Sequence, residues 1–409
     1  MKNFPDCTLD IAEAICAGEG FEAERTLDLL ASLINKSLVI AETAGRAQAR
    51  YRLLETIREY ALEKLNESSK AQRLRNRHLE LFLARAEEAA PKLGDAYQQL
   101  WLNWLEGEHD NLRAALIWAL ESDRIEAGMR ITIALVRFWE IRGYVHECMA
   151  WFERLLARTD EGVSPVVRAN AFTYASFAAM FLGKVSTAMT YSREAVSMAE
   201  AVGEKNNPIL ILALGSLATG AQAAGDYQIA FTIGQRELQL MREAPADPFL
   251  LGMSLLGNGN IAVEAGQYDT AREWLGESLR MAQEAGDAYR IAHTYTTLGN
   301  LARYEENYIE AIALYEKSIA LLCELEARHD LAAILRSLGC ACLLQGEIER
   351  AVDLFNESLQ MHQAEQNTRG IVECLIGLGS TAVVQGLPVA GARLLSAAMA
   401  LRGDRYTHV

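Results

Sequence analysis

The sequence has few prolines and no arrangement of cysteines that would build a disulfide framework or a metal site. Its 409 residues include 7 prolines, which favours a mostly helical chain. Its 7 cysteines are odd in number and lack CxxC spacing, which is typical of reduced thiols in a cytoplasmic protein. Cys340 and Cys342 form a CxC pair, but no second cysteine or histidine pair stands near them in the sequence. We therefore expect neither disulfides nor a bound metal.

The sequence also lacks a secretion signal and an uninterrupted apolar run. Residues 2–6 lead into a mixed helix rather than an apolar segment. The most apolar window, residues 208–225, carries Ser216, Thr219 and Gln222, which predicts a core helix instead of a membrane span. With 51% hydrophobic and 23% charged residues, the composition is that of a folded soluble protein. We expect a cytoplasmic location and no membrane partner.

Catalytic motifs are missing as well. The 7 histidines are scattered, and the sequence contains no HExxH, no GxSxG and no paired carboxylates. Glu108, His109 and Asp110 are adjacent, but neighbours on a helix point in different directions, so we interpret them as capping and packing residues. Five tryptophans have helical spacings and are expected in the core rather than at a sugar-stacking site: 101, 104, 118, 139 and 151. We predict a protein that is not an enzyme and needs no cofactor.

A repeat of about 40 residues runs from residue 165 towards the C-terminus. One small residue recurs at intervals of 40 to 42 residues and serves as a marker: Ala188, Ala230, Ala271, Ala311, Ala351 and Gly391. A second small residue stands 12 positions earlier: Ser176, Ala218, Gly259, Gly299, Gly339 and Gly379. Five positions before the marker stands Gly183, Gly225, Gly266, Glu306, Gly346 or Gly386. Three positions after it stands Tyr191, Ile233, Trp274, Leu314, Leu354 or Leu394. Four positions that keep phase through six copies establish the repeat.

Each copy is expected to fold as two helices joined by a glycine-centred turn. The turn glycine would end the first helix in a left-handed conformation, and the two small residues would let the helices cross closely. The residue three beyond the marker should then face the partner helix. One hairpin cannot bury its own apolar face, so neighbouring hairpins must stack into a continuous core. The sequence therefore predicts an all-α superhelix, an α-α solenoid.

This pattern resembles the tetratricopeptide repeat (TPR) in a longer form. The resemblance covers residues 165–402, and we assign six repeats to residues 165–409. A degenerate seventh copy is assigned to residues 126–164. It is indicated by these residues: Gly143, Cys148 at the marker position, Trp151 and, in place of the small residue, Val136.

Residues 1–66 have a different character and predict a partial winged helix. We expect helices at residues 8–17 and 24–35, then strands at 38–41 and 50–54. The turn between the strands would contain Ala44, Gly45 and Arg46, and a further helix would begin near Glu55. Helix, helix, hairpin, helix is the order of a winged helix that lacks its first helix. Residues 67–125 are assigned to a helical linker region.

Several stretches together point to one family. They read LDLLASL at 27–33, KSL at 36–38, RYRLLETIREYA at 50–61, EHDNLRAAL at 108–116, WAL at 118–120, RFW at 137–139, WFERLL at 151–156 and ARLL at 392–395. These stretches are similar to bacterial STAND-type signal-transduction ATPases, the AfsR-like and LuxR-type regulators that are relatives of the NB-ARC switch proteins. Members carry a P-loop ATPase before the winged helix, whereas this sequence has no GxxxxGK[ST] motif. The resemblance implies the back half of a switch protein, which would not hydrolyse ATP alone and would work with an ATPase module in cis if the native protein is longer.

The resemblance also implies a position for nucleotide contact. In plant NB-ARC relatives a Met-His-Asp motif in the winged helix contacts the phosphates of the nucleotide through its histidine. The matching positions here are Leu53, Leu54 and Glu55. Leucine cannot donate a hydrogen bond, so we expect no nucleotide contact at Leu54, and we expect Glu55 to cap its helix.

A basic stretch leaves DNA binding open as a minority interpretation. Nine basic residues lie between 46 and 77: Arg46, Arg50, Arg52, Arg58, Lys64, Lys70, Arg73, Arg75 and Arg77. Four acidic residues lie among them: Glu55, Glu59, Glu63 and Glu67. A winged helix with a basic wing can contact DNA phosphates. The net charge of −15 favours the alternative, a domain-contact surface or a solvated helix face, so we expect nucleic acid not to be the partner.

The concave face of the superhelix is the predicted binding surface. In the TPR pattern it is lined by first-helix positions six and three before the small crossing residue and one and four after it. The polar residues there are Asn260, His293, Thr296, Asn300, Arg303 and Arg336, with Arg130, Arg137 and Glu140 from the degenerate copy. Apolar residues occupy other such positions: Leu212, Met253, Leu256, Val263, Leu343, Ile376 and Val383. Stacked asparagines can hold an extended peptide, and Arg303 or Arg336 can hold a carboxylate. The alternative is a set of ordinary solvated residues.

Two functions therefore remain open. The first is the effector-sensing, autoinhibitory arm of a STAND-type transcriptional or signalling regulator, with a small inducer or a protein segment held in the groove. The second is a stand-alone cytosolic adaptor that binds a peptide of a partner protein.

Overall fold

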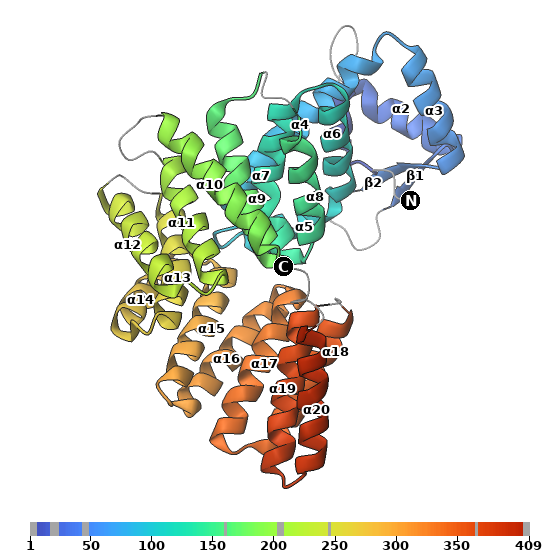
Figure 1. Cartoon of the computed structure of the whole chain (residues 1–409). Helices are drawn as coiled ribbons and strands as arrows, with labels where there is room; N and C mark the ends of the chain where they lie inside the picture. The colour runs from blue at the N-terminus through green and yellow to red at the C-terminus, as the bar shows by residue number, and fades with distance from the viewer. Residues whose placement is uncertain are drawn as a thin grey trace.

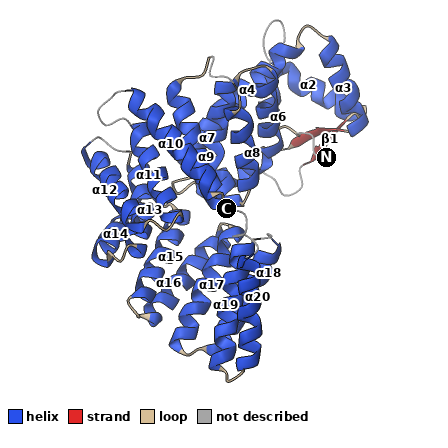
Figure 2. Cartoon of the chain, viewed as in Figure 1, coloured by secondary structure: helices blue, strands red, loops and turns tan. Residues whose placement is uncertain are grey.

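The computed structural model describes residues 6–16, 24–42, 49–158, 162–202, 208–243, 247–364 and 367–403. These residues are almost entirely helical, with one two-stranded sheet near the N-terminus (Figure 2). The predicted architecture is confirmed: a small N-terminal domain with a β-hairpin precedes an α-α superhelix (Figure 1).

The N-terminal domain consists of α1 (Leu9–Cys16), α2 (Glu24–Asn35), β1 (Val39–Glu42), β2 (Arg50–Leu53) and α3 (Glu55–Glu67). The strands pair antiparallel, with Val39 opposite Leu53, as the wing prediction requires. The turn predicted at residues 44–46 lies outside the described residues. Leu54 is the N-cap residue of α3 and makes no side-chain cap hydrogen bond, so Glu55 is the first helical residue and not the cap. Its position in the first turn is one where the helix dipole favours a negative charge.

Three helices join this domain to the superhelix: α4 (Ala71–Lys92), α5 (Gln98–Gly107) and α6 (His109–Glu121). Arg50 on β2 attaches the wing to them. Its Nη1 donates to Glu108 Oε1 at 2.6 Å, and its Nη2 donates to the Gly107 carbonyl at 3.1 Å. The Arg50 side chain is 10% exposed and that of Glu108 is 1% exposed, so this ion pair is buried between the two parts of the chain.

Seven helical hairpins follow, beginning with the degenerate copy. Their helices are α7 (Ile125–Arg142), α8 (Val145–Leu156), α9 (Pro165–Phe181), α10 (Val185–Val202), α11 (Pro208–Ala223), α12 (Tyr227–Glu243), α13 (Pro248–Glu264), α14 (Tyr268–Ala285), α15 (Ala288–Tyr304), α16 (Tyr308–Glu324), α17 (Arg328–Gln345), α18 (Ile348–Ala364), α19 (Thr368–Val384) and α20 (Pro388–Gly403). The even-numbered helix of each pair begins shortly before a marker residue, as the repeat predicted.

The turns inside the hairpins have the predicted left-handed residue. The five repeat glycines have φ values from 68° to 93°, and Gly143 of the degenerate copy has φ 78°. Glu306 adopts the same conformation with φ 63°, although it has a side chain. The hydrogen bonds of the two kinds of turn match: Gln267 N donates to Ala262 O at 2.8 Å, and Asn307 N donates to Ala302 O at 2.8 Å. The turn at Glu306 thus keeps the backbone geometry of the glycine turns, although a residue with a side chain disfavours this left-handed conformation.

The small residues lie where the two helices of a hairpin cross, and one detail of the prediction needs correction. The side chain that fills the crossing belongs to the residue four beyond the marker, not three. A Cβ added at Gly259 would lie 2.6 Å from Leu275 Cδ2, and one at Gly299 would lie 2.8 Å from Tyr315 Cε1. The residue three beyond the marker, such as Trp274, packs in the core beside the crossing.

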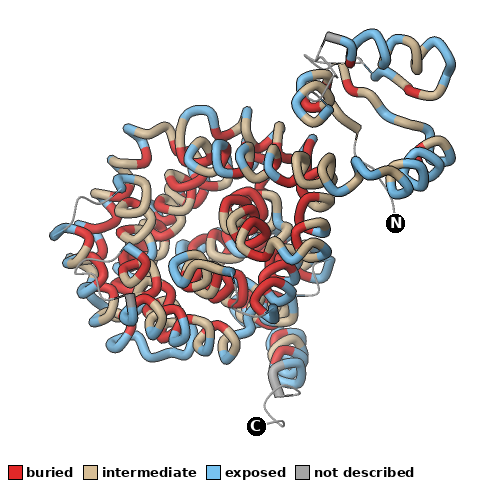
Figure 3. The backbone as a smooth tube through the Cα atoms, turned by 90° about the horizontal axis from the view of Figure 1, so that it is seen from above, coloured by how far each residue is buried: buried red, intermediate tan, exposed pale blue. Residues whose placement is uncertain are grey.

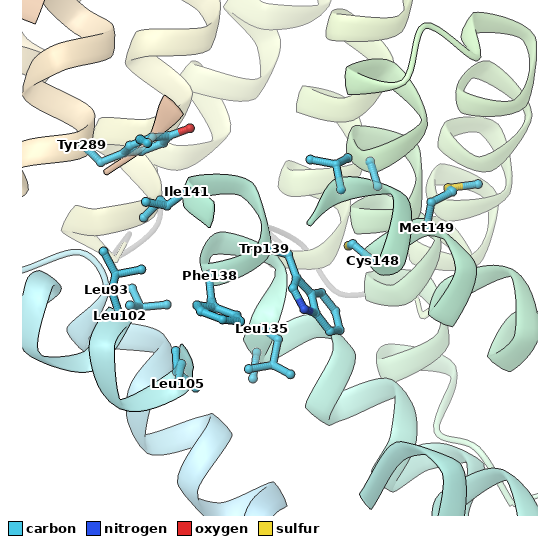
Figure 4. Packing of buried hydrophobic residues seen from close by; sticks show 14 of the residues in the cluster. Leu93, Leu102, Leu105, Leu135, Phe138, Trp139, Ile141, Cys148, Met149 and Tyr289 are labelled. Atoms are coloured by element: carbon cyan, nitrogen blue, oxygen red, sulfur yellow. The ribbon is translucent and has the colours of Figure 1, made fainter. Parts of the chain in front are cut away.

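One hydrophobic cluster connects parts of the chain that are distant in sequence. It contains residues of α4–α9 together with residues of α15–α18. Buried residues accordingly run through the interior of the superhelix (Figure 3). Figure 4 shows Tyr289 of α15 beside Ile141 of α7, with Leu93 and Leu102 near them. The superhelix therefore curls until its first hairpin lies against α15 and α17.

Candidate functional site

The predicted groove residues fall into two groups in the structure. Arg137, Glu140 and His293 meet where α7 lies against α15 and α17. Thr296, Asn300, Arg303 and Arg336 lie on α15 and α17. Two residues stand apart from both groups: Asn260 is half-buried on α13, and Arg130 donates through Nε to Glu87 Oε1 of α4 at 2.7 Å, so it faces that helix instead of a groove.

Arg137 is bound to the chain itself. Its Nη2 donates to both carboxylate oxygens of Asp287 at 2.6 and 2.7 Å, and its Nε donates to the Leu93 carbonyl at 2.8 Å. Asp287 has no exposed surface, and its side chain also accepts from the amide of Arg290, which makes it the N-cap of α15. A buried charge pair of this kind holds only because each group has several partners.

Further polar contacts surround this pair. Gln98 Nε2 donates to the Leu93 carbonyl at 2.5 Å, and Gln98 Oε1 accepts from the Tyr289 amide at 3.1 Å. Arg142 Nη1 donates to the Leu325 carbonyl at 2.8 Å. We call the whole set the closing contact, because it closes the superhelix. Its residues are Leu93, Gln98, Arg137, Glu140, Arg142, Asp287, Tyr289, His293, Leu325, His329 and Asp330.

Asp330 forms a second centre of charge within the closing contact. Its carboxylate lies 3.4 Å from Nε2 of His293 and 3.4 Å from Nε2 of His329. Its Oδ2 also accepts from the Tyr289 hydroxyl at 3.0 Å. The two imidazoles and this hydroxyl hold the pKa of Asp330 below its usual value, although burial alone would raise it.

Glu140 reaches the same cluster from α7. Burial raises the pKa of its carboxyl group, Arg137 and His293 lower it, and Asp330 raises it. For His293 burial lowers the pKa, but Asp330 and Glu140 outweigh burial, so the pKa stays above the ordinary value. The closing contact therefore contains groups whose charge depends on the protonation of their neighbours.

The second group of predicted residues lies beside a buried tyrosine. The Tyr315 hydroxyl donates to Asn300 Oδ1 at 2.7 Å, which fixes the orientation of that amide. Arg303 is half-buried, and its guanidinium lies over the Tyr304 ring, 4.7 Å from the centroid. Burial raises the pKa of Cys340 on α17, and the positive charges of Arg336 and Arg303 partly oppose this rise, so both guanidinium groups lie near that thiol.

These side chains differ in the contacts that they make within the chain. Arg336 Nε lies 3.1 Å from Glu373 Oε2 of α19. The buried Nε of Arg303 donates no hydrogen bond within the described residues. Thr296 Oγ1 lies 2.8 Å from Ser318 Oγ and takes part in the packing of α15 on α16. Asn300, Arg303 and Arg336 are therefore the predicted residues best placed to meet a ligand.

Three surface hollows lie away from these residues. A hollow of about 570 Å³ borders α20, and two of about 330 and 340 Å³ border α12 and the turns near it. No predicted groove residue lines any of the three.

Sequence reasoning missed a buried glutamate in the third hairpin. Glu237 of α12 is 2% exposed, and it accepts from Ser254 Oγ at 2.5 Å and Asn258 Nδ2 at 2.8 Å. Burial raises its pKa to about 7. The signal was available, because the position seven beyond the marker is Ala or Ser in the other five copies: Ala195, Ser278, Ser318, Ser358 and Ala398. Gly215 and Gly234 make room for this network.

The three residues of the Glu108-His109-Asp110 stretch face different partners, as predicted. Glu108 binds Arg50, His109 Nε2 lies 3.1 Å from Trp139 Nε1, and Asp110 pairs with Arg113 at 3.0 Å. Across the part of the chain that the structure describes, no cluster of three or more His, Cys, Asp or Glu side chains is placed to hold a metal ion.

The basic stretch is largely engaged in contacts within the chain. Arg50 is buried against Glu108, Arg52 pairs with Glu42 at 3.3 Å, and Lys64 pairs with Glu67 at 2.7 Å. Arg75 donates to Asn66 at 2.6 Å and lies over the Trp118 ring. These residues of the stretch make contacts within the chain, and the preference for a domain-contact surface over DNA binding stays a prediction.

Comparison with protein families confirms both predicted folds. Residues 7–66 match the winged helix-turn-helix domain, and residues 251–324 and 291–364 match the tetratricopeptide repeat. None of the helices within the described ranges has the length and apolar character needed to cross a membrane.

Two curated relatives match different shares of this chain. A Mycobacterium bovis protein named as an HTH-type transcriptional regulator is 29% identical over 333 residues, which cover 79% of this chain and 36% of that protein. A second Mycobacterium bovis protein, described as uncharacterized, is 48% identical over 64 residues, which cover 15% of this chain and 16% of that protein. The chain is thus homologous to HTH-type transcriptional regulators, and it spans 36% of the length of the first relative.

A solved structure shares the superhelical fold. A Rap protein complexed with Competence and Sporulation Factor superposes with a TM-score of 0.56 at 11% identity, over 80% of this chain and 98% of that chain. A STAND protein with a tetratricopeptide repeat sensor from Pyrococcus horikoshii superposes with a TM-score of 0.48 at 17% identity, over 97% of this chain and 63% of that chain.

Proposed function

We propose that this chain is the ligand-sensing TPR arm of a larger, STAND-type transcriptional regulator. The arm binds a protein segment or a small effector on the concave side of α15, α17 and α19. It recognises its ligand without catalysing a reaction, and its partner in cis is an ATPase module. Homology to a longer HTH-type regulator supports the regulatory role. The Rap protein of the same fold, which is complexed with Competence and Sporulation Factor, provides a precedent for ligand binding by such a superhelix.

One observation carries the proposal: Asn300, Arg303 and Arg336 lie on neighbouring first helices with their polar groups half-buried. Tyr315 orients the Asn300 amide, and the Nε of Arg303 keeps an unused donor in a partly desolvated place. An oriented amide can read a peptide backbone, and a guanidinium can hold a carboxylate with two parallel hydrogen bonds. The site therefore favours an extended, acidic or carboxylate-terminated ligand.

A peptide library with free C-termini, displayed on phage, tests this binding. Selected peptides are then measured by fluorescence anisotropy against the wild-type chain and against the double variant N300A/R303A. We expect the double variant to lose about 30-fold in affinity, the effect of two charge-assisted hydrogen bonds. The control variant R280A/E284A removes an exposed ion pair on α14 and should change affinity less than about twofold. Equal binding by all three proteins would show that the ligand does not occupy this face.

The alternative of a stand-alone adaptor differs from the sensor arm in what accompanies the chain. Reading the gene in frame upstream of residue 1 separates the two. A P-loop ATPase in the same frame supports the sensor arm. A stop codon close to residue 1 supports an adaptor that binds a peptide of a partner protein.

A further inference from the structure

The closing contact is held mainly by charged side chains from three helices. From α7 come Arg137, Glu140 and Arg142, and from α15 come Asp287, Tyr289, Arg290 and His293. From α17 come His329 and Asp330. Cys148 of α8 lies close enough to Glu140 for that carboxylate to raise the pKa of its thiol. Glu106 and Glu326 are 42% and 71% exposed and pair with Arg142 at the edge.

The charge balance of this contact depends on the imidazole of His293. When it is protonated, it attracts the carboxylates of Asp330 and Glu140. When it is neutral, three carboxylates remain, those of Glu140, Asp287 and Asp330. Arg137 is bound to Asp287 and also lowers the pKa of Glu140, and Arg290 lies 3.6 Å from Asp287. The repulsion between Glu140 on α7 and Asp330 on α17 then loses the positive charge of His293 that opposed it.

His329 also lies at the backbone of the facing hairpin turn. A Cβ added at Gly143, where the chain turns from α7 to α8, would lie 3.5 Å from the His329 Cβ. Two helices that approach as closely as this transmit a change in charge directly to the distance between them. Ile141 of α7 and Tyr289 of α15 belong to one buried hydrophobic cluster, so apolar packing also contributes to the contact (Figure 4).

We propose that the closing contact is a proton-controlled clasp: protonated His293 on α15 holds α7 and α17 against that helix, and loss of its proton lets the superhelix open. This regulation goes beyond the proposed function, and it holds whether or not the concave face binds a ligand. Opening would separate α7 from α15 and so widen the concave face at the end nearest Arg137.

The direction of the pH effect follows from three groups. The pKa of His293 is raised above 6.5, so its stabilising charge is fully present below that pH and is lost as the pH rises through the raised value. Burial raises the pKa of Glu140 above 4.5, and the ionised form of this group adds repulsion to Asp330. The pKa of Asp330 is lowered, so it stays ionised throughout. The clasp is therefore strongest in mild acid and weaker at alkaline pH.

Small-angle X-ray scattering of the full chain tests the clasp between about pH 5.5 and 8.5 at constant ionic strength. We expect the radius of gyration of the wild type to increase reversibly as the pH rises. The variant H293Q/H329Q should have the larger radius already at the acid end. H146Q, which removes an exposed histidine on α8, should follow the wild type.

A second variant keeps the test decisive if H293Q/H329Q does not fold. E140Q removes the repulsion with Asp330 and should stay compact at the alkaline end, which is the opposite change. Circular dichroism at each pH checks that the helices persist. A wild-type radius that does not change with pH would overturn the proposal. So would a pH response that survives in H293Q/H329Q, or an E140Q protein that expands as the wild type does.

Discussion

Arg137 and Asp287 are separated by 150 positions in the sequence, yet one nitrogen of the guanidinium donates to both carboxylate oxygens at 2.6 and 2.7 Å. This pair joins the first hairpin of the superhelix to the fifth helical pair. The two side chains are 10% and 0% exposed, so the pair lies out of water. The pair therefore links α7 to the start of α15 in the curled superhelix.

Removal of Arg137 should destabilise the fold strongly. In R137A the buried carboxylate of Asp287 loses its counter-charge, which costs about 3–5 kcal/mol. The double variant R137M/D287N should recover most of this loss, because asparagine still caps α15 and no buried charge remains. Thermal unfolding followed by circular dichroism measures both.

R130A serves as the control for this change. Arg130 lies on the same helix and pairs with Glu87 at a site where both side chains are at least 40% exposed. Its removal should change stability by less than about 1 kcal/mol. If R137A and R130A unfold at the same temperature, the closing contact does not stabilise the fold.

Glu237 should make stability fall as the pH rises. Its pKa is about 7 in the folded chain against 4.5 in the ordinary state, so the folded state keeps a proton that the unfolded state loses. The contribution of Glu237 to the free energy of unfolding is therefore greatest below pH 4.5, decreases between pH 4.5 and 7, and stays low above pH 7. In E237Q that loss is absent, and the variant should exceed the wild type by about 3 kcal/mol at pH 8.

The melting temperature of wild type and E237Q between pH 4.5 and 8 checks this expectation. E243Q, at an exposed position of the same helix, should keep the slope of the wild type. A wild-type slope that persists in E237Q would assign the pH dependence to another group.

The fourth repeat turn should gain stability from glycine. Glu306 has φ 63° where the other five repeats have glycine, and a side chain strains this conformation. E306G should therefore raise the free energy of unfolding by about 1 kcal/mol. The reciprocal variant G346E, at φ 93°, should lower it by a similar or larger amount. If both substitutions shift the melting temperature in the same direction, backbone strain at these turns is not the cause.

The sequence predicted those parts of the fold that repeat. Markers such as Ala271 and Ala311 predicted the positions of the helices and of their crossings, because small residues at that spacing indicate that two helices approach closely. The closing contact could not be predicted in this way, since the phase of Arg137 tells which face it occupies but not how far the superhelix curls. Only the accumulated rotation of all hairpins brings it to Asp287.

The candidate site, too, could be predicted from the sequence only in part. The positions of Asn300, Arg303 and Arg336 followed from the repeat, and the structure places them on α15 and α17 as expected. Their partners Tyr315 and Glu373 belong to other helices and depend on side-chain packing. Glu237 departs from the repeat pattern, and this departure is visible in the sequence. Its hydrogen-bond network could not be predicted, because Ser254 and Asn258 belong to the next hairpin.

The central claim is that a ligand binds the concave side of α15, α17 and α19. Hydrogen–deuterium exchange of the full chain, with and without a peptide selected from the displayed library, tests it most directly. The account predicts slower exchange in α15, α17 and α19 of the wild-type chain when the peptide is present. In N300A/R303A the peptide should not slow the exchange of these helices. Slower exchange confined to the winged helix domain or to the outer side of α20 would contradict it.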